Sequence, residues 1–143
     1  NPIANAENFI NGWFRTGDIG KLDSLGFLII VDRAKDIVIR GGENIGCAEV
    51  EYAISEHPEV SEVSVYGIPE ERLGEMLCCS IMLQAGSVLN SEQLTSFLSS
   101  RIASFKIPER AFFQYEQLPR IATGKIAKKE LRKKTLEFLG VDA

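Results

Sequence analysis

The 143-residue sequence has a single histidine and only three cysteines, so side chains that bind transition metals are scarce. Cys47, Cys78 and Cys79 lack the spacing of metal ligands, and their odd number argues against a framework of disulfides. We therefore expect no metal site, and reduced, mostly buried thiols in a cytoplasmic protein. His57 has no nucleophile or metal ligand at a useful spacing, and the proline that follows it indicates the end of a helix.

Long hydrophobic runs are also missing. The longest, near 27–31 and 77–83, are far too short to cross a bilayer, and we recognise no signal peptide. There is no Ser/His/Asp arrangement, no pair of carboxylates at an obvious acid–base spacing and no P-loop. Composition, with 45% apolar and 25% charged residues, is ordinary for one globular domain. The chain starts without methionine in a polar stretch, and we expect it to be part of a longer protein.

Charge is unevenly distributed along the chain, whose formal net charge is −4. Residues 43–75 are rich in glutamate, whereas residues 119–134 are basic apart from Glu130. A basic segment is compatible with nucleic-acid binding. However, aromatic residues that would stack on bases are missing from it, and the whole chain is acidic. We therefore favour a solvated helix face and expect no nucleic-acid partner.

Hydrophobic periodicity predicts an α+β fold. The expected pattern is a β-hairpin, then a second small hairpin, then a compact sheet of about three strands covered by helices. No periodicity is found in 1–11, and 69–75 reads as a polar loop. Strands are expected at 13–18, 19–23, 27–32, 37–40, 60–67, 76–83 and 110–115, a return strand from Ile45, and helices at 47–57, 90–104 and 127–139.

Four short segments could carry chemistry. Proline and Thr-Gly within 118–125 predict a tight turn with Lys125 at its exposed tip, where an ammonium suits an anionic group of a ligand. Asp18 follows a glycine turn and could accept hydrogen bonds from a diol, or merely form an Asx turn. Gly42 lies in a glycine pair that allows close approach of a ligand, or only the turn itself. The mixed charges of 32–36 predict a connector between two packed bodies.

Taken together, these motifs resemble the C-terminal part of the adenylate-forming enzymes, which include acyl-CoA synthetases, adenylation domains of peptide synthetases and beetle luciferases. The resemblance covers nearly the whole chain and rests on many motifs in the right order and spacing. They are F-R-T-G-D, D-R-A-K-D, G-G-E-N-I, A-E-V-E, H-P-E-V, G-I-P, G-E, F-K-I-P and L-P-R-x-A-T-G-K-I. It implies that residues 1–32 are the tail of a large adenylating domain, that 33–36 form a hinge, and that 37–143 form a mobile lid domain.

The resemblance also implies an AMP-forming ligase that joins a carboxylic acid, in our interpretation a fatty acid, to CoA. Such an enzyme uses ATP, Mg²⁺ and CoA: it first forms acyl-AMP and pyrophosphate, and after a domain rotation it transfers the acyl group to a thiol. Its partners are the large N-terminal domain of the same chain and the thiol acceptor. Loading of a carrier-protein thiol is the alternative, and free CoA is favoured because no carrier-like segment follows the last helix. A stand-alone binding module is the alternative outside the family.

By the same resemblance, Asp18 would bind the ribose hydroxyls of AMP, and Arg33 would contact the ribose or phosphate. Lys35 would be the residue whose backbone rotation moves the lid. Lys125 would contact the carboxylate and the α-phosphate during adenylation, where preorganised positive charge stabilises developing negative charge. Gly42 would line the path of the pantetheine arm of CoA.

Two further expectations follow from the resemblance. Gly46-Cys47 stands where relatives often have an aromatic residue and proline, which loosens the start of the next helix. Because the phosphate-binding loop and the acyl pocket would lie upstream, the 143-residue chain alone should not adenylate any acid. Its first hairpin would lack its neighbours, and exposed strand edges favour self-association.

Overall fold

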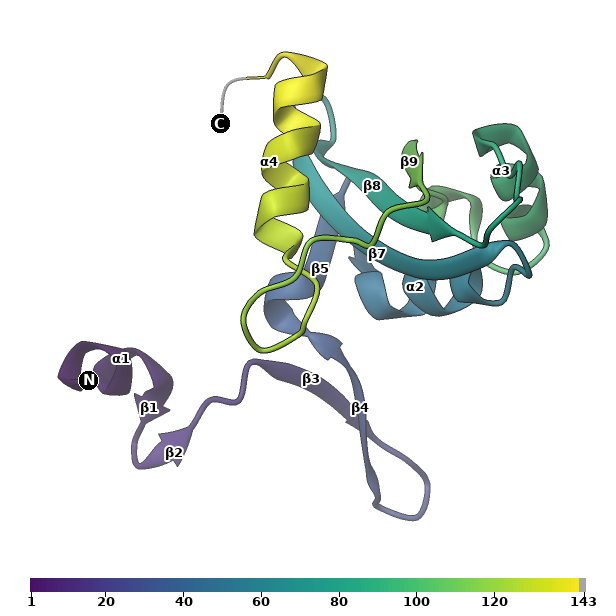
Figure 1. Ribbon diagram of the computed structural model, residues 1–143. Coiled ribbons are helices and arrows are strands. Elements are labelled where there is room, and N and C mark those ends of the chain that lie inside the picture. The colour runs from purple at the N-terminus through teal and green to yellow at the C-terminus, as the bar shows by residue number, and fades with distance from the viewer. Residues whose placement is uncertain (142–143) are drawn as a thin grey trace.

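The computed structural model describes residues 1–141, apart from the side chain of Ala4, so residues 142–143 of the expected lid lie outside the described part (Figure 1). An extended N-terminal arm, residues 1–33, leads into a body that comprises residues 37–141. In the body, a mixed sheet of five strands has the order β6-β5-β8-β7, with β9 paired in parallel to β8. Its elements are β5 (Ile37–Arg40), β6 (Glu43–Gly46), α2 (Cys47–Ser55), β7 (Val60–Glu70), β8 (Gly74–Leu83), α3 (Ser91–Ser99), β9 (Arg110–Gln114) and α4 (Lys128–Leu139).

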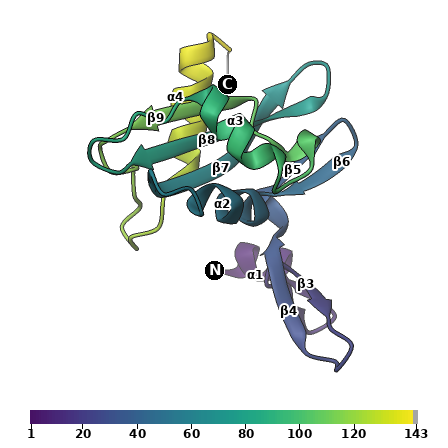
Figure 2. The ribbon, with the colours of Figure 1, turned by 90° about the vertical axis from the view of Figure 1, so that its right-hand side faces the viewer.

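Helices cover both faces of the sheet, with α2 and α3 on one face and α4 on the other (Figures 1 and 2). Because side chains alternate along a strand, β7 supplies both faces. Val65 packs into the cluster with α2 and α3, whereas Tyr66 and Ile68 pack into the cluster with α4. The apolar run expected in a central strand is β8, which is buried on both faces and pairs with β7, β9 and one residue of β5. The α+β class is thus confirmed.

The body differs from the sequence-based expectation at its turns. The small hairpin β5–β6 is not separate but joins the other three strands in one sheet through the pair Arg40–Gly74. The polar loop predicted at 69–75 is wrong, because β7 and β8 pair up to Glu70 and Gly74. The Glu70 carboxylate accepts the N–H groups of Arg72 and Leu73, at 3.1 and 2.8 Å, and so closes the short turn between them. The return strand β6 also begins two residues earlier than Ile45.

The arm contains α1 (Pro2–Asn8), β1 (Phe9–Ile10), β2 (Trp13–Phe14) and a hairpin of β3 (Asp18–Leu22) with β4 (Leu28–Arg33). The helix α1 was not predicted, since its residues show no apolar periodicity. Most of the large apolar side chains of the arm are exposed, and Trp13 is 80% exposed. Isolated two-stranded hairpins are marginal in water, and exposed apolar patches mark interaction surfaces.

The ends of the helices in the body are capped in different ways. The Asn90 side chain accepts the N–H of Gln93 at 3.0 Å while the Gln93 side chain accepts the N–H of Asn90 at 3.0 Å, which is a capping box at the start of α3. Gly140 ends α4 in the left-handed conformation, with φ of 67°. At the N-terminus of α2, no side chain at the N-cap position, Gly46, caps the helix.

Between residues 1 and 141, the helices are all too short or too polar to span a membrane.

Candidate functional site

The loop that carries Lys125 is closed by its own hydrogen bonds. Arg120 and Ile126 form an antiparallel bridge, and the Ile121 N–H donates to the Lys125 carbonyl oxygen at 2.9 Å. Gly124 has φ of 84°, a conformation that favours glycine. Arg120 donates to the Gly124 carbonyl oxygen at 2.5 Å and forms an ion pair with Glu62 of β7. These contacts close the loop and connect Arg120 to β7, and the residues from Ile121 to Lys125 are exposed.

The Lys125 side chain is exposed and makes no hydrogen bond or ion pair with any of residues 1–141. It lines a groove of about 840 Å³ that extends from the loop along the start of α4 and β7 to the connector between arm and body. The groove is predominantly basic. Its cationic residues are Arg33, Lys35, Arg120, Lys125, Lys128 and Lys129, against the acidic residues Asp36 and Glu51. Such an arrangement suits an anionic ligand.

One of these cations is already engaged within the body. Lys128 Nζ lies 2.9 Å from Glu51 Oε1, and the same oxygen accepts the Val65 N–H at 2.8 Å. Burial by itself would lower the pKa of Lys128, but the charge and hydrogen bond of Glu51 outweigh it, so the pKa lies above its usual value. Lys128 therefore fixes the start of α4 to α2 and β7. Lys125, three residues earlier, remains available to a ligand.

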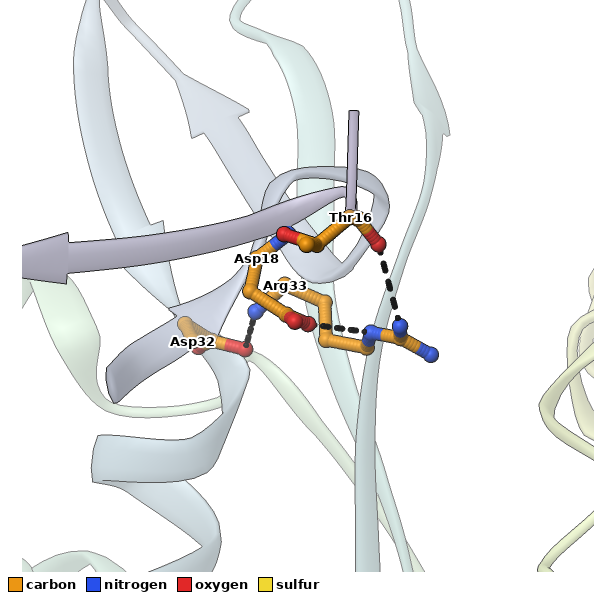
Figure 3. A network of polar contacts seen from close by, with 4 residues as sticks. All are labelled: Thr16, Asp18, Asp32 and Arg33. Atoms are coloured by element: carbon orange, nitrogen blue, oxygen red, sulfur yellow. Dashed lines mark hydrogen bonds and ion pairs between the residues drawn. The ribbon is translucent and has the colours of Figure 1, made fainter. Parts of the chain in front are cut away.

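Asp18 and Arg33 come together at the end of the arm hairpin (Figure 3). They are paired across β3 and β4, and Arg33 Nε lies 2.8 Å from Asp18 Oδ1. Arg33 also donates to the Thr16 carbonyl oxygen at 3.3 Å, while the Thr16 hydroxyl oxygen accepts the Asp18 N–H at 3.1 Å. Both side chains remain partly exposed, so the pair presents a carboxylate and a guanidinium side by side.

The connector between arm and body is short. On the arm side, the Ala34 N–H donates to the Gly17 carbonyl oxygen at 2.8 Å; on the body side, Ile37 pairs with Gly46. Only Lys35 and Asp36 lie between these two attachments, within a single 3₁₀ turn, Ala34–Asp36. Lys35 is exposed and lines the same groove as Lys125.

Four of the five predicted site residues lie together, and the fifth, Gly42, lies apart from them. Arg33, Lys35 and Lys125 line the groove, and Asp18 joins them through its ion pair with Arg33. Gly42 lies elsewhere, in the turn between β5 and β6, with φ of 86°. A Cβ added to Gly42 would meet no atom within 4 Å. Gly42 is therefore at an open part of the surface, away from the groove that contains Lys125.

Three residues of this region were not singled out from the sequence: Arg120, Lys128 and Asp32. Arg120 stands within the L-P-R motif, but its role depends on Glu62, 58 residues away. Lys128 likewise depends on Glu51. Asp32 is only 7% exposed, and its Oδ2 accepts the Ala48 N–H at 3.0 Å, so it caps α2. The only hint of this contact in the sequence is that Asp32 is a charged residue directly after the apolar residues of β4.

Comparison with known proteins identifies the family. A profile of the AMP-binding enzyme C-terminal domain matches residues 49–125, more than half of the chain. The chain belongs to this family. The long-chain-fatty-acid–CoA ligase FadD13 of Mycobacterium tuberculosis is 44% identical over 131 residues, 92% of this chain and 26% of the relative. The oxalate–CoA ligase of Arabidopsis thaliana is 39% identical over 137 residues, 96% of this chain and 26% of the relative. This AMP-binding C-terminal domain thus spans about a quarter of the length of these relatives.

Among solved structures, MatB of Rhodopseudomonas palustris is similar in two states. The ATP-bound structure gives a TM-score of 0.86 at 33% identity, and the apo structure gives 0.74 at 34% identity. Both comparisons cover 96% of this chain and 27% of MatB. At the same coverage, the TM-score is thus higher for the ATP-bound structure.

Proposed function

We propose that this chain is the mobile lid domain, with part of the preceding domain, of an ATP-dependent, AMP-forming carboxylate–CoA ligase. The observation that carries the proposal is the position of Lys125: its exposed ammonium has no partner among residues 1–141 and lies on a braced loop, in a basic groove shared with Arg33 and Lys35. Membership of the AMP-binding C-terminal domain family and the CoA-ligase relatives support it. Lys125 would neutralise charge that develops on the carboxylate and α-phosphate as acyl-AMP forms.

Asp18 and Arg33 would bind the nucleotide. Asp18 Oδ1 is paired with Arg33, which orients the carboxylate and leaves its other oxygen for the ribose hydroxyls. Arg33 would reach the ribose or phosphate from the groove. Residues 1–141 contain no group of three His, Cys, Asp or Glu side chains that could by themselves hold a metal ion. We therefore assign no metal ligand and no metal-dependent step to this chain.

Rotation at Lys35 would separate the two half-reactions. The proposed division is a large-domain tail at 1–32, a hinge at 33–36 and a lid at 37–143. The two attachments on either side of residues 35–36 support it, because a short unpaired connector can absorb a dihedral change. After rotation, Gly42 would face the pantetheine path, where its missing side chain leaves room. Lys35→Pro should restrict this rotation and slow thioester formation more than adenylation.

CoA is the proposed acceptor, because the relatives named above are CoA ligases. A fatty acid is the proposed substrate, on the strength of FadD13. The Arabidopsis relative, whose sequence identity to this chain is similar to that of FadD13, is named for oxalate, which is far more polar than a fatty acid. An activity profile of the full-length ligase against fatty acids and short dicarboxylates decides between them; preferential use of a dicarboxylate would exclude a fatty-acid ligase.

The decisive experiment is Lys125→Ala in the full-length ligase. ATP–pyrophosphate exchange should fall by about 10²- to 10³-fold, the effect of removing one preorganised stabilising group. Thioester formation from supplied acyl-AMP should remain. Lys133→Ala is the matched control, because Lys133 is an exposed lysine of α4 outside the groove. Equal loss of both half-reactions would contradict the role proposed for Lys125.

The isolated 143-residue chain should show no ATP–pyrophosphate exchange, since the acyl pocket and phosphate-binding loop would belong to the large domain. Its exposed arm should also promote self-association, which light scattering over a concentration series would detect. Measurable exchange by the purified chain would refute the assignment of the chemistry to a neighbouring domain.

A further inference from the structure

Asp32 joins the arm to the body at the start of α2. The residue stands at the end of β4, yet it is only 7% exposed, whereas its strand neighbours Val31 and Arg33 are exposed. Its Oδ2 accepts the Ala48 N–H at 3.0 Å, and its Oδ1 accepts the N–H of Arg33 at 2.7 Å. Ala48 is the second residue of α2, so Asp32 satisfies one of the N–H groups that a helix leaves free at its N-terminus.

The cap takes the place of one that α2 lacks. The residue at the N-cap position is Gly46, which has no side chain to accept a hydrogen bond. A Cβ on Gly46 would lie 2.8 Å from Asp32 Oδ2. Absence of a side chain there leaves space for the Asp32 carboxylate, which also interacts favourably with the helix dipole.

This hydrogen bond crosses the connector. Asp32 lies before the attachment of Ala34 to Gly17, on the arm side, whereas Ala48 lies after the pairing of Ile37 with Gly46, on the body side. A large backbone rotation at Lys35 moves α2 relative to Asp32. The cap therefore exists in the present pose and is lost in any pose reached by a large rotation.

We propose that Asp32 is a positioning residue that stabilises the adenylation pose of the lid by capping α2 across the hinge. The inference deepens the proposed function and rests on it. Removing the cap raises the free energy of one pose alone, so it changes the equilibrium between the poses as well as the stability of the fold. An ordinary structural cap changes only the stability.

The test compares two caps in the full-length ligase. Asp32→Ala removes the cap across the hinge, and Asn90→Ala removes the cap of α3, which lies entirely on the body side. Loss of a cap corresponds to a factor of about five. The pose equilibrium, measured by energy transfer between dyes on the two domains, should shift about fivefold away from the adenylation pose in Asp32→Ala and stay unchanged in Asn90→Ala.

The half-reactions provide the second measurement. Asp32→Ala should slow ATP–pyrophosphate exchange by up to about fivefold and leave thioester formation from supplied acyl-AMP as fast or faster. Asp32→Asn keeps one oxygen for the Ala48 N–H but loses the acceptor for the Arg33 N–H, so it should restore part of the exchange. If Asp32→Ala and Asn90→Ala leave the pose equilibrium equally unchanged, the inference is refuted. If Lys125→Ala still slows ATP–pyrophosphate exchange and spares thioester formation, the proposed function stands without this inference. If Lys125→Ala slows both half-reactions equally, the proposed function and the inference are both refuted.

Discussion

The hydroxyl of Tyr66 is the polar link between the sheet and α4, the helix that follows the Lys125 loop. It lies 2.8 Å from Ser80 Oγ on β8 and 2.8 Å from Thr135 Oγ1 on α4. Tyr66 is fully buried, and Ser80 and Thr135 are only 4% and 3% exposed. Tyr66→Phe keeps the ring but removes both hydrogen bonds, and it leaves two buried hydroxyl groups without this partner.

The cost follows from that geometry. A typical intramolecular hydrogen bond contributes about 0.5–1.5 kcal/mol, and a buried polar group left unpaired costs about 1–3 kcal/mol. We therefore expect Tyr66→Phe to lower the free energy of unfolding by about 2 kcal/mol. For a chain of this length, that corresponds to a decrease in Tm of roughly 6 °C.

Urea denaturation of the 143-residue chain, at low protein concentration, measures the effect. Tyr52→Phe is the control, because Tyr52 is 69% exposed, and it should change stability by less than about 0.5 kcal/mol. In Tyr66→Phe/Thr135→Val, one orphaned hydroxyl is also removed, so the double variant should be more stable than the sum of the single losses predicts. If Tyr66→Phe costs no more than Tyr52→Phe, or if the two losses simply add, the hydroxyl network does not hold α4 to the sheet.

Two further predictions concern alkaline pH and the Lys125 loop. Burial raises the pKa of Cys47 and Cys78 to about 12, from an ordinary value of 9.0; their stabilising effect is therefore complete below pH 9 and is lost as the pH rises towards 12. Urea denaturation between pH 8 and 11 should show this decline, and Cys78→Ala should make it shallower; an identical slope would exclude the thiol. Arg120→Met should loosen the loop and reduce ATP–pyrophosphate exchange in the full-length ligase by about tenfold, less than Lys125→Ala. Exchange at the wild-type rate would show that the loop needs no brace.

Local patterns were sufficient wherever a single segment carries its own signal. The helix expected from residue 47 begins there as α2, and the helix expected at 127–139 is α4, which ends at Leu139 as expected. The same holds for the turn that exposes Lys125, because proline fixes its own φ and glycine accepts the positive φ of 84° found at Gly124. The helix α1 was not predicted because its residues show no apolar periodicity.

Contacts between distant segments were decided by the tertiary structure. The sequence by itself predicted an α+β fold and a set of candidate site residues. It also showed the resemblance that the family comparison confirmed. It could not pair Arg120 with Glu62, Lys128 with Glu51, or Asp32 with the start of α2, because charged side chains look alike in sequence whether they are solvated or paired. Only folding selects the partners, since an ion pair or cap forms when packing of the sheet and helices brings two particular groups within about 3 Å.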